Sequence, residues 1–477
     1  MGAEIELKLE LPEAAADRLL REPWLGKACE PQKQTSVYFD SPQRQIRERG
    51  YTLRVREAGG RFVQTVKSLD NGAGFYQRGE WEYQIETAQP DAERLAHTPL
   101  SGIDVATLTP IVRSEVNRTI CKLDEDGAEI ELAVDRGAVR AGKRKAAISE
   151  LELELIRGEP AGAVSLARRI AHSVPVKLSV MSKAERGFAL ADGKLGKVVK
   201  AEPLAVRPGM SVAEGFATIV SACLRHFCLN EPLVIEQRLP AALHQARVAM
   251  RRLRSALSLF GTAITDPELP RLREELRSFT GELGDARNLD VYLLRELPAG
   301  EKASIKERRE AAYDRVIAAM DSEPVRMLML DLVAWSALGA WRGNAAAQRP
   351  LEPYARGRID RLWRRIVQSG KIGHMQEEER HRLRIQIKKL RYALEFMETL
   401  YVEHRERQKR FGKTIEDLQE ALGHLNDLAV ARTLIASDSW LIPGHEEDDE
   451  QQLGLIRDAE DSLHQLRRIG PYWRNNS

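Results

Sequence analysis

Hydrophobic residues recur with two different periods along this chain. Up to about residue 190 they alternate with polar residues, as in strands, and beyond about residue 210 they follow a helical period. The alternating region predicts strands at 3–11, 36–40, 51–57, 61–67, 78–86, 112–122, 128–135 and 148–156, and short helices near 12–21, 90–97 and 160–173. Many antiparallel strands separated by hairpin turns favour a closed or nearly closed barrel.

A segment rich in Gly, Pro and Lys separates the two regions. It runs from Asp192 to Gly209 and is interpreted as a linker. We therefore expect a multidomain α+β protein, with a β-rich domain over residues 1–200 and an all-α domain over residues 208–475.

One face of the predicted strands carries charges where a solvated face would carry mixed polar residues. The strand at 3–11 places Glu4, Glu6 and Lys8 on one side and aliphatic residues on the other. The same alternation recurs at Arg54 and Arg56, at Thr65 and Lys67, at Arg78, Glu80 and Glu82, at Glu129 and Glu131, and at Glu150, Glu152 and Glu154. A sheet with one solvated face is the ordinary alternative, but such a face would hold more Ser, Thr and Gln.

Charges of both signs indicate a ligand if this face is turned inward. A buried charged lining is costly unless its charges pair with each other or meet ligands. Clustered carboxylates suit Mg²⁺ or Mn²⁺, and clustered Arg and Lys suit phosphate oxygens. The pattern therefore predicts a tunnel that binds a metal-chelated polyphosphate.

The order of short motifs in this region resembles the CYTH superfamily, the triphosphate tunnel metalloenzymes. The matching elements are ExExK from Glu4, YFD from Tyr38, LRVR from Leu53, TVK from Thr65, RGEWE from Arg78, ELELEL from Glu150 and SKAERGFAL from Ser182. The resemblance covers roughly residues 1–200. It implies an eight-stranded antiparallel tunnel that hydrolyses or rearranges triphosphates with Mg²⁺ or Mn²⁺, with two ions per tunnel.

The resemblance also assigns roles to the matched residues. Metal ions would be held by Glu4 and Glu6 together with two of Glu150, Glu152 and Glu154. The triphosphate would be bound by Lys8, Arg54, Arg56, Lys67, Arg78, Arg118 and Lys183. Glu80 and Glu82 would line the tunnel and bind metal or water, so that they join Glu4, Glu6 and Lys8 in the expected catalytic group.

Two of these assignments stay open at the level of the sequence. The three glutamates of ELELEL share one parity, so spacing does not decide which two are ligands. Arg113 and Arg118 have opposite parity, so one of them faces inward, and we favour Arg118. No GxxxxGK[ST] loop and no Ser/His/Asp or Cys/His constellation competes for the chemistry.

The helical half repeats itself. HQARVAMRRLRSAL from His244 is matched by HRLRIQIKKLRYAL from His381, and LGDARNLDV from Leu283 is matched by LGHLNDLAV from Leu422. Two copies of one helical unit are expected about a pseudo-twofold axis, over about 208–345 and 346–475.

Each copy carries a basic stripe headed by a histidine. The stripes are His244, Arg247, Arg251 and Arg254 in the first copy, and His381, Arg384, Lys388 and Arg391 in the second. At ~100° per residue each stripe lies within an arc of roughly 80°. A solvated helix face would more often intermix Glu with Lys, so the stripes favour polyanion binding.

The repeated H-x-x-R-x-x-x-[RK]-[RK]-L-R segments and the LG turns after them resemble the CHAD domain, over roughly residues 208–475. This resemblance implies a bundle of two four-helix halves that binds inorganic polyphosphate in a basic central groove. His244 and His381 would then donate to phosphate or cap the groove. A CYTH domain followed by a CHAD domain resembles the bacterial inorganic triphosphatases.

Composition narrows the class of protein. The 477 residues are 43% hydrophobic and 30% charged, which excludes a mainly disordered chain. Charges at the N-terminus and the lack of a long apolar window predict a cytoplasmic protein with no membrane segment. The four cysteines include no CxxC pair, so neither a zinc ribbon nor a disulfide scaffold is expected.

The predicted function is metal-dependent hydrolysis of inorganic triphosphate to pyrophosphate and phosphate, with inorganic polyphosphate bound by the helical domain. Three alternatives remain: a polyphosphate-binding scaffold with weak turnover, an adenylate cyclase or thiamine triphosphatase, and a nucleic-acid binder. Nucleic acid is disfavoured because 73 basic residues face 71 acidic ones and the stripes lack interleaved aromatic residues. Chain-length preference, the preferred metal, oligomeric state and domain coupling are not decided by the sequence.

Overall fold

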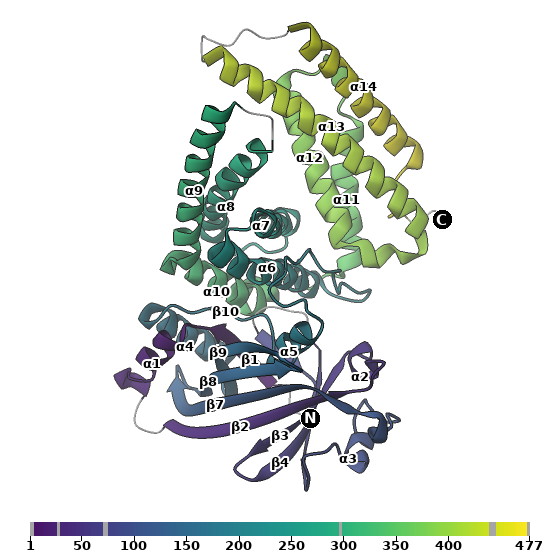
Figure 1. Cartoon of the computed structure of the whole chain (residues 1–477). Helices are drawn as coiled ribbons and strands as arrows, with labels where there is room; N and C mark the ends of the chain where they lie inside the picture. The colour runs from purple at the N-terminus through teal and green to yellow at the C-terminus, as the bar shows by residue number, and fades with distance from the viewer. Residues whose placement is uncertain (1–3, 26–28, 70–74, 295–297, 438–444, 475–477) are drawn as a thin grey trace. The chain divides into compact units, whose positions relative to one another are not determined.

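A computed structural model of the chain describes residues 4–25, 29–69, 75–294, 298–437 and 445–474 (Figure 1). The chain divides into two compact units. The first comprises Met1–Glu202, Val220–Arg251 and Pro267–Gly339, and the second comprises Pro203–Ile219, Arg252–Asp266 and Ala340–Ser477. The first unit therefore holds the whole N-terminal sheet together with part of the helical half.

The strands of the N-terminal region form one antiparallel sheet. They are β1 (Glu4–Glu10), β2 (Cys29–Asp40), β3 (Tyr51–Ala58), β4 (Arg61–Ser68), β5 (Phe75–Arg78), β6 (Glu80–Ile85), β7 (Thr109–Glu125), β8 (Ala128–Ala141), β9 (Arg144–Arg157) and β10 (Lys177–Leu178). The eight predicted strands are all present. Two short strands, β5 and β10, were not predicted.

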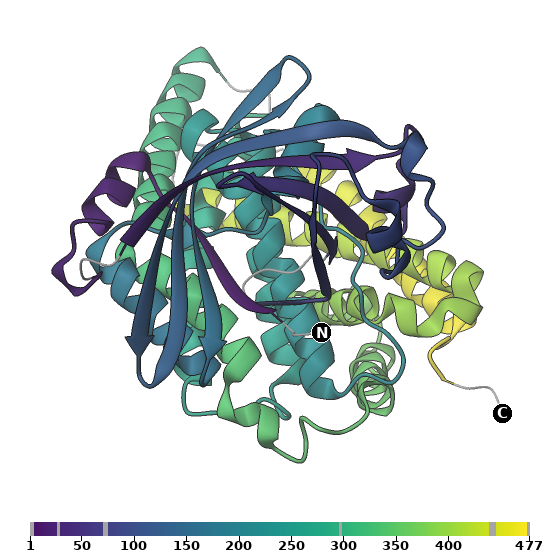
Figure 2. The ribbon, with the colours of Figure 1, turned by 90° about the horizontal axis from the view of Figure 1, so that it is seen from below.

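The sheet forms a nearly closed tunnel, because the two ends of its path of strands are joined through one short segment. Hydrogen-bonded neighbours follow the order β10-β1-β9-β8-β7-β2-β3-β4-β6, and β5 also pairs with β1. Only Gly79 separates β5 from β6, which pairs with β4, so this segment joins the two sides of an otherwise open path. Figure 2 shows the curvature of the sheet from below.

Burial on both faces of β1 confirms that the charged face is an interior one. Leu7 and Leu9 on one face are 2% and 0% exposed. Glu6 and Lys8 on the other face are each 6% exposed. A strand with one solvated face would leave these charges in water, so the ordinary alternative does not apply here.

Several strands are longer than the alternation predicted. β2 begins at Cys29 rather than at 36, since Pro31 and the polar residues around it hide the period while the backbone still pairs with β7. The hairpin of β8 and β9 extends to Ala141 and Arg144, through a stretch whose pairing is regular although its alternation is weak.

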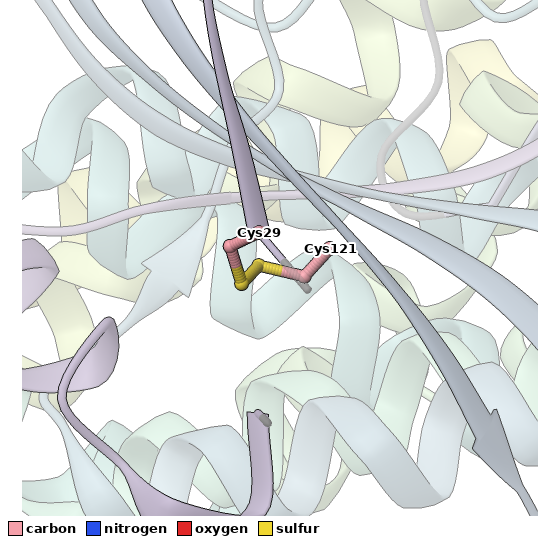
Figure 3. Close-up of a disulfide and its surroundings, with 2 residues drawn as sticks. All are labelled: Cys29 and Cys121. Carbon is pink, nitrogen blue, oxygen red and sulfur yellow. A yellow bond between two sulfur atoms is a disulfide. The ribbon is translucent and has the colours of Figure 1, made fainter. Parts of the chain in front are cut away.

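One pair of cysteines forms a disulfide that the sequence analysis did not predict, since it expected no disulfide scaffold. Cys29 on β2 faces Cys121 on β7, with a Cα–Cα distance of 4.4 Å, and the two form a disulfide (Figure 3). That separation is typical of a non-hydrogen-bonded antiparallel pair. Their pairing depends on the early start of β2, which the sequence pattern did not show. Cys223 and Cys228 lie outside this disulfide and are buried.

The α-helices that accompany the sheet in the described residues are α1 (Glu13–Leu19), α2 (Gln45–Glu48), α3 (Ala92–Ala96), α4 (Pro160–Ser173) and α5 (Lys183–Ala191). Short 3₁₀ turns lie at Pro23–Leu25 and Val105–Thr107. Helix α5 was not predicted, although Ser182 and Glu185 form a capping box at its start. It packs closely on β7, where a Cβ on Gly187 would lie 2.2 Å from Val112 Cγ1.

The helical half contains α6 (Val212–Gln237), α7 (Pro240–Phe260), α8 (Leu269–Tyr292), α9 (Ala299–Asp321), α10 (Glu323–Leu338), α11 (Leu351–Val367), α12 (Glu377–Phe396), α13 (Arg405–Ser437) and α14 (His445–Ile469). Further 3₁₀ turns lie at Ala340–Gly343, Ile372–His374 and Glu398–His404. The repeated motifs fall on α7 and α8 in the first copy and on α12 and α13 in the second, in the order that the repeat predicts. The LG segments, which were expected to be turns, lie inside α8 and α13.

One described helix is long and apolar enough to cross a membrane by length and composition. This is α6, with a mean hydropathy of 1.3 in its most apolar window, of which 67% is buried. The core helix of a folded domain passes the same test, so this is weak evidence for a membrane span.

Candidate active site

The charged faces of the strands line a cavity of about 420 Å³. Its acidic lining residues among those described are Glu6, Glu80, Glu82, Glu131, Glu152 and Glu154. Its basic lining residues are Lys8, Arg54, Arg56, Lys67, Arg118 and Lys183. Seven strands and the start of α5 supply these twelve side chains, so the tunnel predicted from alternation brings both signs of charge together.

Glu152 lies at the centre of the most buried part of this lining. Its Oε1 accepts hydrogen bonds from Lys8 Nζ at 2.7 Å and from Lys183 Nζ at 2.8 Å, and its Oε2 accepts one from Arg118. Lys8 Nζ also lies 3.2 Å from Glu6. Three cations thus converge on one carboxylate from β1, β7 and α5.

Asp135 on β8 completes this network, although the sequence analysis did not select it. Its side chain is 0% exposed and accepts two hydrogen bonds from Arg118, at 2.8 and 2.6 Å, and Lys183 Nζ lies 2.7 Å from Oδ2. Asp135 shares the parity of Glu129 and Glu131 on the same strand, which is the signal that could have found it.

The network holds its members in their ionised forms. Burial alone would lower the pKa of Lys183, but Asp135 and Glu150 raise it well above the ordinary lysine value. Burial would likewise raise the pKa of Glu152, but Lys183 and Lys8 lower it well below the ordinary value. The site therefore presents fixed charges before any ligand enters.

Glu150 differs from the other two glutamates of ELELEL. It is 1% exposed and does not line the cavity, and one of its oxygens accepts a hydrogen bond from Lys183. Its Oε2 has no hydrogen-bond partner among the described residues. Oxygens of Asp135, Glu150 and Glu152 lie within 4.8 Å of one another, in a buried acidic cluster.

A second group of charges lies on β3, β4 and β6. Glu80 lies 3.1 Å from Lys67 and 3.9 Å from Arg54, and Glu82 lies 3.4 Å from Arg56. The neighbouring Arg54, together with burial, lowers the pKa of Arg56. Two guanidinium groups forced close together in this way favour an anion between them.

The remaining predicted residues are placed as follows. The side chains of Glu4 and Arg78 lie outside the described part of the structure, although their backbones pair across β1 and β5. Arg118 faces the cavity with 13% of its side chain exposed. Arg113 has 55% of its side chain exposed and pairs with Glu115, so it does not line the cavity.

Part of the first basic stripe lies in the first compact unit, on α7 beside α8. Arg247 donates to the backbone oxygen of Gly284 at 2.9 Å. His244 is exposed and lines a hollow together with Arg287. Partial burial, with Arg287 and Arg251 nearby, lowers the pKa of His244.

The second stripe lies in the second compact unit, on α12 beside α13. His381 Nδ1 lies 2.9 Å from Asn426 Oδ1, and Arg391 donates to Gln419 at 3.0 Å. Arg384 approaches Gly423, which corresponds to Gly284 in the repeat. Arg254 also lies in this unit and is exposed, and Lys388 is half-buried.

Comparison with known proteins identifies both halves of the chain. The CYTH domain family model matches residues 2–188, and the CHAD domain family model matches residues 218–436. An inorganic triphosphatase from Haemophilus influenzae is 29% identical over 199 residues, which are 40% of this chain and 55% of that protein. This chain thus spans about half the length of that relative.

Two solved structures are also similar. The CHAD domain from the plant Ricinus communis is 29% identical, with 56% of this chain and 97% of that one covered and a TM-score of 0.47. A putative adenylyl cyclase from Hippeastrum, said to show a dominant triphosphatase activity, is 21% identical, with 40% and 97% covered and a TM-score of 0.33. From the two family matches, the chain carries an N-terminal CYTH domain followed by a CHAD domain.

Proposed function

We propose that the CYTH domain of this protein hydrolyses inorganic triphosphate to pyrophosphate and phosphate. The observation that carries the proposal is the cavity lining, in which six carboxylates and six basic side chains meet in about 420 Å³. A triphosphate with its divalent cations is a ligand that presents both signs of charge. The similarity to an inorganic triphosphatase supports this substrate.

The basic side chains bind and orient the phosphate chain in this proposal. Lys8, Arg118 and Lys183 lie at one part of the lining, and Arg54, Arg56 and Lys67 lie on β3 and β4. Arginine binds phosphate oxygens in pairs, and lysine binds them as a point charge. Holding the phosphate chain so that the attacking water and the leaving oxygen lie in line across the terminal phosphorus contributes to the rate, because positioning replaces a random encounter by a step within one complex.

The donor set fits a divalent metal ion. Carboxylate oxygens are the ligands that Mg²⁺ and Mn²⁺ prefer, and the cavity lining includes the carboxylates of Glu6, Glu152 and Glu154. Glu6, Glu152 and Glu154 would hold the ion, with Glu4 from the predicted set, and Glu80 and Glu82 would hold water or a second ion. A bound divalent ion supplies charge neutralisation at phosphate oxygens and a lowered pKa for a bound water.

The test is phosphate release from inorganic triphosphate by the full chain with Mg²⁺ or Mn²⁺, with ATP and thiamine triphosphate in parallel. We expect fast release from inorganic triphosphate that is lost on adding EDTA. Glu6→Gln should abolish turnover, whereas Glu129→Gln should not, since Glu129 is a half-buried glutamate that pairs with Arg157 and is not among the described lining residues. Full activity of Glu6→Gln would contradict the assignment. Binding without turnover would favour a scaffold, and faster release from ATP would favour a nucleotide enzyme.

We further propose that the CHAD domain binds inorganic polyphosphate through its two basic stripes. Helix α12 offers a matched comparison, since Arg384 belongs to the stripe and Arg382 is an exposed arginine outside it. Arg384→Ala should weaken polyphosphate binding measured by calorimetry, and Arg382→Ala should leave it nearly unchanged. Equal losses would indicate non-specific attraction, and preferential competition by single-stranded RNA would favour a nucleic-acid binder.

A further inference from the structure

The start of helix α5 determines where Lys183 lies in the cavity. Lys183 is the first residue of α5, directly after the N-cap residue Ser182. The Ser182 N–H donates to Glu185 Oε2 at 2.7 Å, and the Glu185 N–H donates to Ser182 Oγ at 3.2 Å. Any shift of this first turn moves the Lys183 ammonium relative to the acidic network that it contacts.

A side chain from outside the sheet holds this turn. Arg225 lies on α6, within the CHAD match and within the same compact unit as the tunnel. Its Nη2 donates to Glu185 Oε1 at 3.2 Å, and its Nη1 donates to the backbone oxygen of Val180. Its Nε donates to Glu202 at 3.1 Å. All three nitrogen atoms of the guanidinium therefore donate hydrogen bonds.

Burial makes these contacts strong enough to matter. The side chain of Arg225 is 8% exposed and that of Glu185 is 12% exposed. A buried charge-assisted hydrogen bond is stronger than a solvated one, and removing one partner leaves the other unsatisfied. Glu185 uses one oxygen for the cap of α5 and the other for Arg225, so the cap and the CHAD helix share one carboxylate.

Other contacts between the same regions touch nothing in the cavity. Arg168 on α4 donates to Asp331 on α10 at 3.0 and 2.8 Å, and Lys177 lies 3.0 Å from Glu231. These pairs join the CYTH and CHAD sequences as Arg225 does, but none of their four residues is among the described residues that line the cavity. They therefore separate docking of the two domains from positioning of the tunnel lysine.

We propose that Arg225 is a positioning residue for Lys183, so that the CHAD domain contributes to triphosphate binding in the CYTH tunnel through this one side chain. The inference rests on the proposed function. Arg225 acts through the carbonyl of Val180 and the carboxylate of Glu185, which flank Lys183 in the sequence. Small displacements of a group that orients substrate are costly, on the order of 10²-fold per ångström in favourable cases.

The test compares Arg225→Met, Arg225→Lys and Arg168→Met in the full chain. We expect Arg225→Met to raise KM for inorganic triphosphate on the order of tenfold while kcat changes less. Arg225→Lys keeps the charge but not the fork of donors, so it should give a smaller change in the same direction. Arg168→Met should leave both constants near wild type.

Measuring the effect of Arg225→Met in a protein that also carries Lys183→Met separates positioning of Lys183 from a general loss of structure. If Arg225 acts through Lys183, then Arg225→Met should have no further effect on KM once Lys183→Met is present. If instead the fold-changes in KM of the two single variants multiply in the double variant, the proposal is overturned. Arg225→Lys carries the same comparison if Arg225→Met does not fold.

The outcomes also separate this inference from the proposed function. A wild-type protein that releases no phosphate from inorganic triphosphate contradicts the proposed function, and the same variants are then compared by calorimetric binding of inorganic triphosphate. An active wild type in which Arg225→Met matches Arg168→Met overturns the positioning role alone.

Discussion

Replacing Asp135 by asparagine tests whether the buried network depends on charge. The substitution keeps the shape of the side chain and removes its negative charge. In the native protein this carboxylate is fully buried and receives two hydrogen bonds from Arg118 and one contact from Lys183. An asparagine retains one acceptor oxygen and turns an NH₂ group toward a cation.

The size of the effect follows from the remaining partners. Removing one partner of a buried ion pair costs about 3–5 kcal/mol. Arg118 keeps Glu152, and Lys183 keeps Glu150 and Glu152, so we expect a loss near the lower limit, about 3 kcal/mol. If opening of these strands governs exchange, this loss corresponds to roughly 100-fold faster amide exchange.

Hydrogen–deuterium exchange of peptides covering Thr109–Arg157 measures the loss locally, without interference from the helical half. Asp17→Asn is the control, because Asp17 also pairs with an arginine, Arg136, but is 53% exposed. An exposed pair contributes about 0–1 kcal/mol. Equal exchange in the two variants would refute the argument that burial makes Asp135 important.

The free energy of unfolding measured at acid pH provides an independent check. Burial would raise the pKa of Asp135, but Lys183 and Arg118 hold this pKa below its ordinary value in the folded protein. Stability from a depressed carboxyl pKa is present above the unfolded pKa, about 4, and is lost as pH falls through the folded pKa. The gap in unfolding free energy between wild type and Asp135→Asn should therefore narrow below about pH 4. A gap that stays constant into acid would contradict the charge argument.

Three further predictions concern other parts of the chain. Reductant should lower the melting temperature of the wild type but not of Cys29→Ser, since the disulfide closes a loop with a sequence separation of 92 and such links contribute about 2–4 kcal/mol. Gly187→Ala should destabilise by about 1–3 kcal/mol in chemical unfolding, because the new Cβ meets Val112, whereas Gly357→Ala, with open space, should be neutral or stabilising. His244 should titrate below the ordinary value of 6.5 by NMR, owing to burial and the neighbouring arginines, and removing one of these should raise its pKa.

The sheet was predicted well from the sequence because the two faces of its strands carry different residue types, which gives hydrophobic and charged residues a period of two along the chain. Strand β1 alternates Leu with Glu or Lys, and the order of residues alone assigns each to a face. Where polar residues occupy both faces, as from Cys29 to Gln34, the period disappears and only hydrogen bonding to β7 defines the strand. The disulfide was missed for the same reason.

The site was predicted less completely than the fold. Parity placed Glu152 and Glu154 on the cavity wall, as the structure does, and the structure places the favoured Arg118 there rather than Arg113. It could not separate Glu150, since depth within the wall depends on how the sheet curls and on which cation reaches each carboxylate. Arg225 had no signal at all, because its contacts with α5 join segments that only the tertiary fold brings together.

Both the ammonium and the backbone of Lys183 are held in place. This bears on how a tunnel whose acidic and basic side chains already pair with each other favours a charged ligand. Asp135, Glu150 and Glu152 contact its ammonium, while the cap of α5 fixes its backbone. A lysine side chain carries about 2 kcal/mol of rotamer entropy, and ordering it in advance removes that cost from ligand binding. An anion alone would draw the cations away and leave buried carboxylates uncompensated, which is costly. A triphosphate that arrives with divalent cations avoids this cost, because its oxygens replace the carboxylates as partners of the basic groups and its cations replace the basic groups as partners of the carboxylates. Under the proposed function, we therefore expect the mixed lining to favour metal-chelated triphosphate over the free anion.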